Sequence, residues 1–256
     1  MSFLKVDRIH HTYFTKESAT NALENISLTI EEGEFVSFLG PSGCGKTTLL
    51  SIIAGLLKPT EGQIIVEGNT SNNSRPSIGY MLQHDYLFPW KTIEENIFVG
   101  LRTMQKYTDE NKQKTIGLLK EMGLKGVEKS YPKQLSGGMR QRASLVRTLA
   151  TNPKILLLDE PFSALDYQTK LKLEDLMSKT LKEYEKTALL VTHDIGEAIA
   201  MSDRIFLLSP NPGSLARTFI IPSQLRNLTP FEARQHGQFA PIFQEIWKEL
   251  DKFEQD

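Results

Sequence analysis

The sequence predicts an α/β fold built around a parallel sheet, because short apolar runs alternate along the chain with longer helical patterns. Four runs are expected to form the central strands, at residues 34–39, 154–158, 187–192 and 204–209. They are apolar on both faces, which is typical of parallel strands buried between two layers of helices.

The remaining elements follow from the same patterns. A glycine-rich turn after the first central strand leads into a helix expected at 46–57, and residues 63–67 are expected to form a short hairpin strand in a more antiparallel N-terminal region. Residues 69–77 have the composition of a polar surface loop. In the tail, an apolar face beginning at Pro241 predicts a terminal helix, which we expect to pack back onto the domain.

These patterns predict one domain over residues 1–256. The α/β core is expected at 1–84 and 151–217, and the mainly helical patterns between them predict an inserted helical subdomain at 85–150. The tail, 218–256, is expected to be a helical extension.

Composition limits the classes of function. The 30 Lys and Arg balance 31 Asp and Glu, giving a formal net charge of -1, which argues against a nucleic-acid-binding protein that depends on a strongly basic face. The single cysteine excludes an internal disulfide framework. No uncharged stretch reaches the roughly 18 to 20 residues of a membrane span, and the N-terminus has charges where a signal peptide needs an apolar run. We therefore expect a soluble, intracellular chain.

A phosphate-binding loop is the strongest motif. Residues 40–47 fit G-x-x-x-x-G-K-[ST] after a strand and before a helix, a context in which backbone amides and the helix N-terminus bind phosphate. Lys46 is expected to reach the outer phosphates, and the Thr47 hydroxyl to bind Mg²⁺. A dinucleotide-binding fingerprint fails, because Thr48 stands where its third glycine belongs. The residues expected to bind nucleotide here are Gly40, Pro41, Ser42, Gly43, Cys44, Gly45, Lys46, Thr47 and Thr48.

Two carboxylates, Asp159 and Glu160, follow the apolar strand at 154–158. Asp159 has the hard oxygen ligands that Mg²⁺ prefers, and Glu160, one step further along, could polarise an attacking water. Alone, acids at a strand end are equally explained by solvation. Together with the phosphate loop they indicate nucleotide hydrolysis.

A second glycine-rich turn, Leu135 to Arg142, opens another predicted helix. Ser136 and the amides of Gly137 and Gly138 form a second plausible anion site. Ser136 could equally be a helix N-cap, and both roles are compatible.

This turn resembles the signature motif of ATP-binding-cassette (ABC) ATPases. Other motifs of that family appear in the expected order between about residues 3 and 210: Tyr13 resembles the adenine-stacking aromatic, Gln83 the Q-loop glutamine, 163–166 the D-loop with Asp166, and His193 the switch histidine. The resemblance implies a P-loop NTPase (RecA-like) core with an antiparallel β subdomain and an inserted helical subdomain. It also implies ATP and Mg²⁺ as cofactors.

The resemblance assigns roles to these residues. Glu160, His193 and Gln83 are implied to be catalytic, and Thr47, Gln83 and Asp159 to bind the metal. Tyr13, Asp166 and Ser136 to Gly138 join the phosphate loop as nucleotide contacts. A structural glutamine in a turn is the alternative for Gln83, and core packing is the alternative for Tyr13, beside which Phe14 stands.

The family also implies partners. Two chains are expected to pair head to tail as a homodimer, with each ATP between one phosphate loop and the other chain's signature turn. A cassette without membrane helices resembles the separate subunit of an importer, which works with an integral membrane permease and an extracytoplasmic solute-binding protein from the cytoplasmic face of the membrane. The aromatics of 83–90 are expected either at the permease contact or inside the helical subdomain.

Details such as Phe88-Pro89-Trp90 and Met139 resemble the nitrate, sulfonate, taurine and bicarbonate importer branch, whose relatives also carry vitamin precursors. A soluble ABC ATPase acting in translation or DNA repair remains an alternative, as does a P-loop kinase or switch protein. The first usually has two cassettes or a long insertion, and the second leaves the signature turn and His193 unexplained. No nucleic-acid partner is expected.

Overall fold

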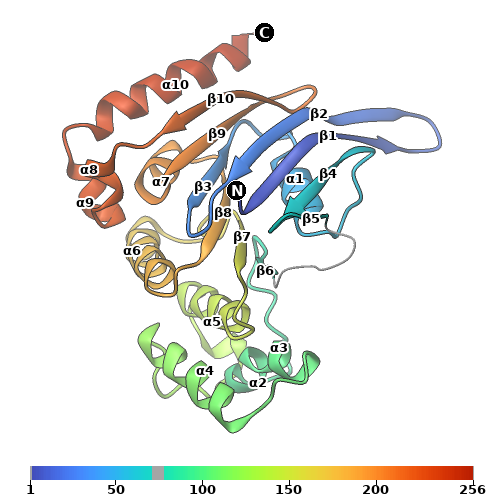
Figure 1. The fold of residues 1–256 in the computed structure, drawn as a ribbon. Helices are drawn as coiled ribbons and strands as arrows, with labels where there is room; N and C mark the ends of the chain where they lie inside the picture. Colours follow the sequence, from blue (N-terminus) through green and yellow to red (C-terminus); the bar gives the residue numbers. More distant parts are fainter. Residues whose placement is uncertain (1, 71–77, 256) are drawn as a thin grey trace.

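Two sheets organise the chain in the computed structural model, which describes residues 2–70 and 78–255 (Figure 1). The larger sheet has six strands in the order β10-β9-β3-β8-β7-β6, parallel from β9 to β6, with β10 antiparallel at one edge. The predicted α/β architecture is confirmed, and the central strands β3, β7 and β8 are buried along their whole length. The strand bounds are β3 Phe35–Leu39, β6 Ile78–Met81, β7 Ile155–Asp159, β8 Thr187–Thr192, β9 Arg204–Ser209 and β10 Ser214–Ile220.

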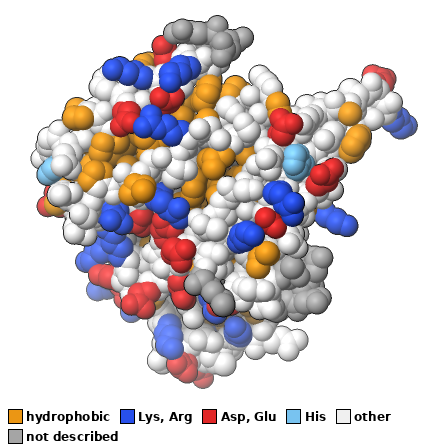
Figure 2. Space-filling view, turned by 45° about the horizontal axis from the view of Figure 1, so that its top comes forward, with side chains coloured by type: hydrophobic (Ala, Val, Ile, Leu, Met, Phe, Trp, Pro, Cys, Tyr) orange, Lys and Arg blue, Asp and Glu red, His pale blue; other side chains and the backbone are white. Residues whose placement is uncertain are grey.

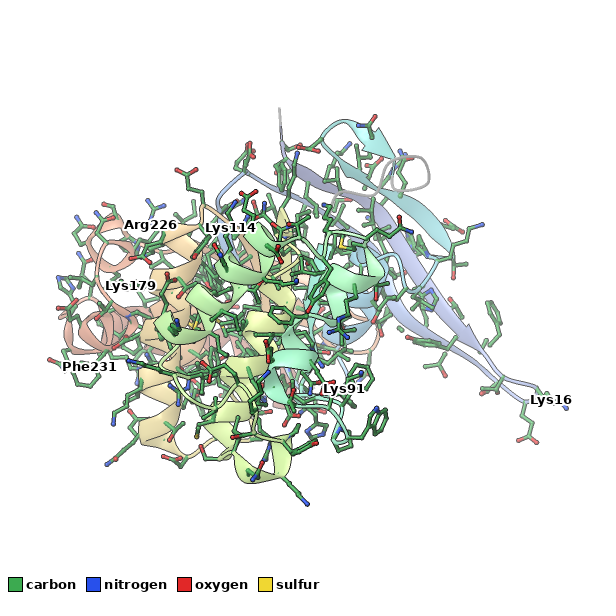
Figure 3. The ribbon with its side chains drawn as sticks, turned by 90° about the horizontal axis from the view of Figure 1, so that it is seen from below. Lys16, Lys91, Lys114, Lys179, Arg226 and Phe231 are labelled. Carbon is green, nitrogen blue, oxygen red and sulfur yellow. The ribbon has the colours of Figure 1, made fainter. Side chains whose placement is uncertain are left out.

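The smaller sheet is antiparallel, in the order β2-β1-β4-β5. Its strands are β1 Leu4–Phe14, β2 Ala19–Ile30, β4 Glu61–Val66 and β5 Asn69–Thr70. The prediction of a loop beginning at Asn69 is wrong for its first two residues, because they pair with β4; residues 71–77 lie outside the described residues. The β1–β2 hairpin projects beyond the body, and Figure 2 shows basic and acidic side chains interspersed on the face beside it. Lys16 lies at the tip of the hairpin (Figure 3).

The two sheets touch beside the phosphate loop. Leu23 of β2 bridges to Gly213 in the β9–β10 turn, where the Glu24 amide donates to the Gly213 carbonyl over 2.9 Å and the Gly213 amide to the Ala22 carbonyl over 3.1 Å. A Cβ on Gly213 would lie 2.2 Å from the Cys44 carbonyl oxygen. The phosphate loop is therefore enclosed by parts of both sheets.

Helices cover the larger sheet and extend from it (Figure 1). The first helix ends at Ile53, earlier than the predicted 46–57, because Gly55 adopts a left-handed φ of +71°. The helices are α1 Lys46–Ile53, α2 Ile93–Ile97, α3 Val99–Thr103, α4 Asp109–Glu121, α5 Gly137–Leu149, α6 Tyr167–Glu183, α7 Ile195–Met201, α8 Ser223–Arg226, α9 Pro230–Gln235 and α10 Phe239–Gln255, with a 3₁₀ turn η1 at Pro132–Gln134.

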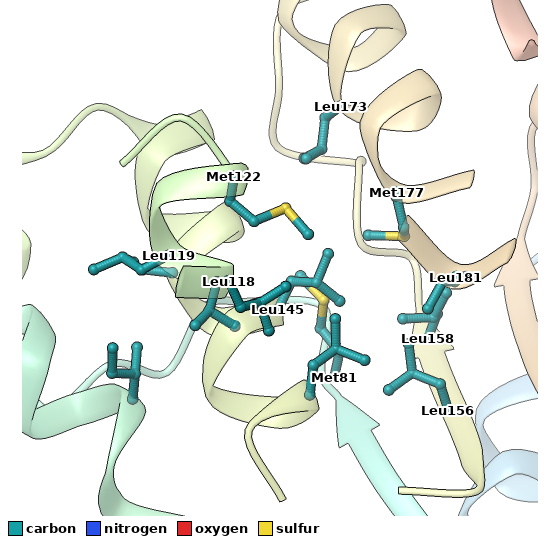
Figure 4. Packing of buried hydrophobic residues seen from close by; sticks show 14 of the residues in the cluster. Met81, Leu118, Leu119, Met122, Leu145, Leu156, Leu158, Leu173, Met177 and Leu181 are labelled. Carbon is teal, nitrogen blue, oxygen red and sulfur yellow. The ribbon is translucent and has the colours of Figure 1, made fainter. Parts of the chain in front are cut away.

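The helices α2 to α5 share one hydrophobic core with the sheet, which fixes their place relative to the site. Figure 4 shows side chains of α4 and α6 meeting those of α5, β6 and β7. The residues drawn include Leu118, Leu119, Met122, Leu145, Met81, Leu156, Leu158, Leu173, Met177 and Leu181. The subdomain boundaries given above remain a prediction.

The C-terminal segment packs onto α6 and α7 through α9 and α10. Its apolar side chains join a third core cluster in which Ile246 is fully buried, together with Leu39 and Ile199 of the α/β core. Among the described residues, the longest helices are too short or too polar to cross a bilayer.

Candidate active site

The turn between β3 and α1 is shaped by close contacts that only glycine allows. Gly45 caps α1 with a left-handed φ of +88°. A Cβ at this position would lie 2.5 Å from Cδ2 of Leu23 and 2.9 Å from the carbonyl oxygen of Ala22. The loop therefore lies directly against β2, and its amides are presented at the N-terminus of α1, where anions are stabilised.

Lys46 turns its side chain back into this loop. Its ammonium is buried and donates to the carbonyl oxygens of Gly40 and Pro41, each over 2.8 Å. The thiol sulfur of Cys44 lies 3.6 Å away, and burial raises the pKa of this thiol, so Cys44 stays neutral. A phosphate group would offer the ammonium charged oxygens in place of these neutral carbonyls, a stronger type of hydrogen bond.

A second part of the site joins α1 to the end of β7. The Thr47 hydroxyl donates to Oδ1 of Asp159 over 3.2 Å, and the Tyr80 hydroxyl donates to Oδ2 over 3.4 Å. Burial raises the pKa of Asp159, although these two hydrogen bonds oppose the shift. Burial and the nearby Asp159 charge raise the pKa of Tyr80 to about 12, so Tyr80 remains a donor.

The donors here fit Mg²⁺. A hydroxyl and a carboxylate stand within hydrogen-bond distance of each other, and both are the hard oxygen ligands that this cation prefers. Mg²⁺ typically keeps several waters and takes few protein ligands, which suits a site of this size. Among the residues that the structure describes, no group of three or more His, Cys, Asp or Glu side chains is arranged to hold a metal ion without other ligands.

Glu160 meets two other predicted catalytic residues. Nε2 of Gln83 donates to Oε2 of Glu160 over 3.3 Å, and Nδ1 of His193 lies 3.3 Å from Oε1. Glu160 has a left-handed φ of +45°, uncommon for a non-glycine residue, and its carbonyl accepts from the Ser163 hydroxyl over 3.0 Å. The carboxylate is thus held between an amide and an imidazole beside Asp159, with capacity to accept a proton.

Tyr13 lies at the other side of the loop. Its hydroxyl is 3.2 Å from the Thr48 hydroxyl, and its ring meets His11 edge to face with centroids 4.6 Å apart. The side chain is 44% exposed, so it is available for stacking and is not a core residue. The neighbouring Phe14 is still more exposed.

The signature turn lies in a different part of the fold. Ser136 caps α5 by accepting from the Met139 amide over 3.4 Å, so the structural role weighed for it is present. Gly138 has a packing role too, since a Cβ there would lie 2.5 Å from Cγ2 of Thr169 in α6. Ser136 and Gly138 border a cavity with Arg142 and Thr169, whereas the cavity beside the phosphate loop is bordered by His193 and Trp247. Gly137 is the first residue of α5, between Ser136 and Gly138.

Asp166 also has a structural contact. Its side chain accepts from the Thr169 amide over 3.0 Å and caps α6, and hydrogen bonding to the side chain and then the amide of Thr169 lowers its pKa. Lys170, one turn into α6, contacts Asp194 over 2.7 Å. The D-loop and the residue after His193 are therefore linked through α6.

Two contacts of the site are not predicted by any motif. Tyr80 shares the less buried face of β6 with Ile78, and a hydroxyl-bearing ring three residues before Gln83 is a signal that could have found it. Gln141 in α5 donates to the Gln83 carbonyl over 3.3 Å, and its place in an amphipathic helix carries no such signal.

A strand–loop–helix phosphate site, a Thr–Asp pair and a carboxylate between glutamine and histidine define a P-loop nucleotide hydrolase. The family model described as ABC transporter matches residues 23–163. The chain belongs to this family, and it is an ATP-hydrolysing member of it.

Three comparisons support the assignment. The chain is 61% identical over 254 residues to YtlC of Bacillus subtilis (strain 168), an uncharacterized ABC transporter ATP-binding protein, covering 99% of this chain and 98% of YtlC. It is 41% identical over 244 residues to the aliphatic sulfonates import ATP-binding protein SsuB of Bacillus cereus, covering 94% and 92% of the two chains. A solved dimeric structure of the ATP-binding cassette MJ0796, bound to ADP and Pi, matches with a TM-score of 0.74 and 36% identity over 86% of this chain and 99% of that one.

Proposed function

We propose that this chain is the ATP-hydrolysing subunit of an ABC importer, acting with a separate integral membrane permease from the cytoplasmic face of the membrane. The similarity to SsuB, named as an import ATP-binding protein, extends over 94% of this chain and supports the importer assignment. The observation that carries the hydrolytic mechanism is the Glu160 carboxylate, which lies 3.3 Å from both Gln83 and His193.

In this proposal Glu160 accepts a proton from the attacking water, because it is a carboxylate beside the phosphate site with two neighbours that orient it. His193, on the other side of Glu160, donates a hydrogen bond to the terminal phosphate as negative charge develops. Tyr13 stacks on the adenine, and Lys46 exchanges its two carbonyl partners for phosphate oxygens.

Thr47, Asp159 and Gln83 would hold Mg²⁺ in this site. The bound cation neutralises phosphate charge. The chain itself contributes the Thr47–Asp159 pair at 3.2 Å, the Tyr80 hydroxyl that keeps the Asp159 carboxylate oriented, and the Gln83 side chain at the neighbouring strand end.

The position of the signature turn, Ser136 to Gly138, supports a dimer. Ser136 and Gly138 border a different cavity from the one beside the phosphate loop of the same chain. A second copy paired head to tail would bring its signature turn, Gly137 included, to this chain's ATP, with Asp166 near the contact. The solved structure of the related cassette MJ0796 with ADP and Pi is dimeric, which is consistent with such a pair.

Small solutes are the proposed cargo class, with aliphatic sulfonates as the first to test because SsuB is named for them. Nitrate, taurine, bicarbonate and vitamin precursors are the further candidates. An extracytoplasmic solute-binding protein would select among them.

The test is uptake in cells of the source organism that lack this chain. Labelled solutes of each class are supplied in turn, and the deletion strain is complemented with the wild type or with Glu160→Gln. Restored uptake of one solute by the wild type alone supports the proposal. The tagged chain is also purified from native membranes: a multi-span permease is expected, whereas ribosomes or DNA would favour the alternative of a soluble ABC ATPase.

A further inference from the structure

An arginine of the C-terminal segment pairs with a buried glutamate of the α/β core. Arg234 of α9 places Nη1 2.7 Å from Oε2 of Glu174 in α6, and the Glu174 side chain is fully buried. Arg234 is itself 15% exposed and also donates to the Pro230 carbonyl. The two helices are joined again where the Phe231 amide donates to Asp175 over 2.9 Å, and Figure 3 shows Phe231 on the same side of the molecule as Lys179 of α6.

On the same helix, one turn before Glu174, Lys170 holds the start of α7. Its ammonium lies 2.7 Å from Oδ2 of Asp194 and 2.9 Å from Oε2 of Glu197, but 3.9 Å from Oε1 of Glu174. Lys170 and Glu197 are nearly buried. Lys170 therefore pairs with the two carboxylates at the start of α7, and the charge of Glu174 is compensated mainly by Arg234.

The carboxylates of α7 fix the backbone beside His193. Asp194 caps α7 by accepting from the Glu197 amide over 3.0 Å, and its own amide donates to the Thr192 hydroxyl over 3.0 Å. His193 stands between these two anchored residues, so the position of its backbone depends on where Asp194 is held.

The buried cluster holds one more carboxylate than it has cations. Three carboxylates (Glu174, Asp194 and Glu197) face two cations (Lys170 and Arg234). Without Arg234, the buried charge of Glu174 would be uncompensated, a costly arrangement. The cation within reach is Lys170, four residues earlier on the same helix, which would move away from α7 to satisfy it.

We propose that Arg234 is a positioning residue for His193. Arg234 neutralises Glu174, which leaves Lys170 to anchor α7. Through Arg234, the C-terminal segment thereby takes part in ATP hydrolysis. The inference rests on the proposed function of His193, and its test includes a readout that does not require activity.

The first variant is Arg234→Gln in the full chain, with Arg234→Lys and Arg234→Gln/Glu174→Gln as its two rescues. At pH 8.5, kcat for ATP is expected to fall about tenfold in Arg234→Gln, the scale of a small misplacement. Little change in KM is expected, because Arg234 pairs with Glu174 and not with the phosphate loop. Both rescues are expected to restore kcat, since one keeps the cation and the other removes the buried charge. Arg226→Gln is the matched control, because Arg226 pairs with Asp203 at the surface of the same segment.

The ratio of variant to wild-type kcat is also expected to depend on pH. Burial raises the pKa of Glu174 to about 7 even with Arg234 present, so near pH 6 it can take a proton and needs no cation. The defect of Arg234→Gln is therefore expected to shrink at pH 6, and the doubly substituted chain should show a flat ratio. A merely loosened α9 would give a defect at both pH values.

The readout independent of activity is the NMR resonance of the His193 ring, assigned with His193→Ala. It is expected to shift in Arg234→Gln and to return in the doubly substituted chain. An unchanged His193 resonance together with wild-type kcat at pH 8.5, or a defect that Glu174→Gln does not repair, overturns the inference. If the wild-type chain hydrolyses no ATP, the proposed function is overturned. The NMR resonance of the His193 ring in Arg234→Gln would then by itself show whether Arg234 positions His193.

Discussion

Nδ1 of His193 lies 3.3 Å from Oε1 of Glu160, although the two residues follow different strands, β8 and β7. The parallel register brings them together, because Asp159 at the end of β7 pairs with Val191 near the end of β8. Side chains that follow neighbouring parallel strands meet at one edge of the sheet, which is where ligands bind in folds of this type.

Glu160→Gln is expected to keep ATP binding but to lower kcat by about 10²–10⁴-fold, because an amide cannot accept the proton of the attacking water. Size-exclusion chromatography with ATP should show an accumulated dimer. Glu183→Gln, which alters an exposed acid paired with Lys179, is the control and should behave as wild type. Normal turnover in Glu160→Gln would falsify the assignment of the base.

Lys46→Ala is expected to weaken ATP binding itself, by about 10- to 100-fold, since one charge-assisted contact to phosphate is lost. Titration calorimetry in the non-hydrolysing Glu160→Gln background separates binding from turnover. Lys58→Ala, which changes a lysine soon after the end of α1 and outside the phosphate loop, should leave affinity unchanged. Equal affinity of the Lys46 and Lys58 variants would show that the ammonium does not reach the phosphates.

Gly138→Ala tests whether the signature turn needs glycine for packing or for phosphate. The added methyl would lie 2.5 Å from Cγ2 of Thr169, so stability should fall by about 1–3 kcal/mol. Thr169→Ser removes that methyl group and should restore the melting temperature of the double variant. If Gly138 also faces a partner's ATP, hydrolysis will stay low after stability returns.

Gly117→Ala is the matched control for that substitution, because a Cβ at this helical position would meet nothing within 4 Å. It should raise stability by about 0.5–1 kcal/mol, as replacing a helix-interior glycine does elsewhere. Destabilisation by both alanines would mean that the Thr169 contact does not explain the effect at Gly138.

Glu174→Gln is expected to stabilise the chain more at pH 8 than at pH 5.5. The folded-state pKa of Glu174 is about 7, above its ordinary value of 4.5, so the folded chain holds this proton more tightly than the unfolded chain. Stability is lost as pH rises from about 4.5 through 7, on the order of 3 kcal/mol for this group. Lys170, Arg234 and Glu197 face Glu174, and Glu197, whose pKa burial also raises, will leave some pH dependence in the variant.

Melting temperatures of the wild type and of Glu174→Gln, measured at pH 5.5 and pH 8, test whether the gain in stability grows with pH. The difference in melting temperature should widen by several degrees from pH 5.5 to pH 8. A difference that narrows with rising pH would mean that Glu174 is more readily ionised in the folded state.

The sequence predicted the central strands well, because buried parallel strands are continuous apolar runs; 187–192 and 204–209 match β8 and β9 to the residue. It misjudged the end of α1, where the local pattern continued to Leu57 but the backbone turned at Gly55. It also missed β5, since two polar residues carry no strand pattern and pair only because β4 is adjacent.

Some residues of the site could likewise be predicted from the sequence, and others could not. Lys46, Asp159, Glu160 and His193 belong to short motifs at strand ends, and the structure places them around one edge of the sheet. The contact between Arg234 and Glu174 joins residues far apart in the chain, and periodicity indicates which residues face inward, not which charges meet there. Tertiary structure alone reveals such pairs.

The Leu23–Gly213 bridge has a mechanical consequence. A side chain on Gly45 would collide with Leu23, and one on Gly213 with Cys44, so the phosphate loop is held closely by both sheets. The amides of Glu24 and Gly213 close this contact between the sheets, so we expect their hydrogen exchange to slow when a bound phosphate orders the adjacent loop.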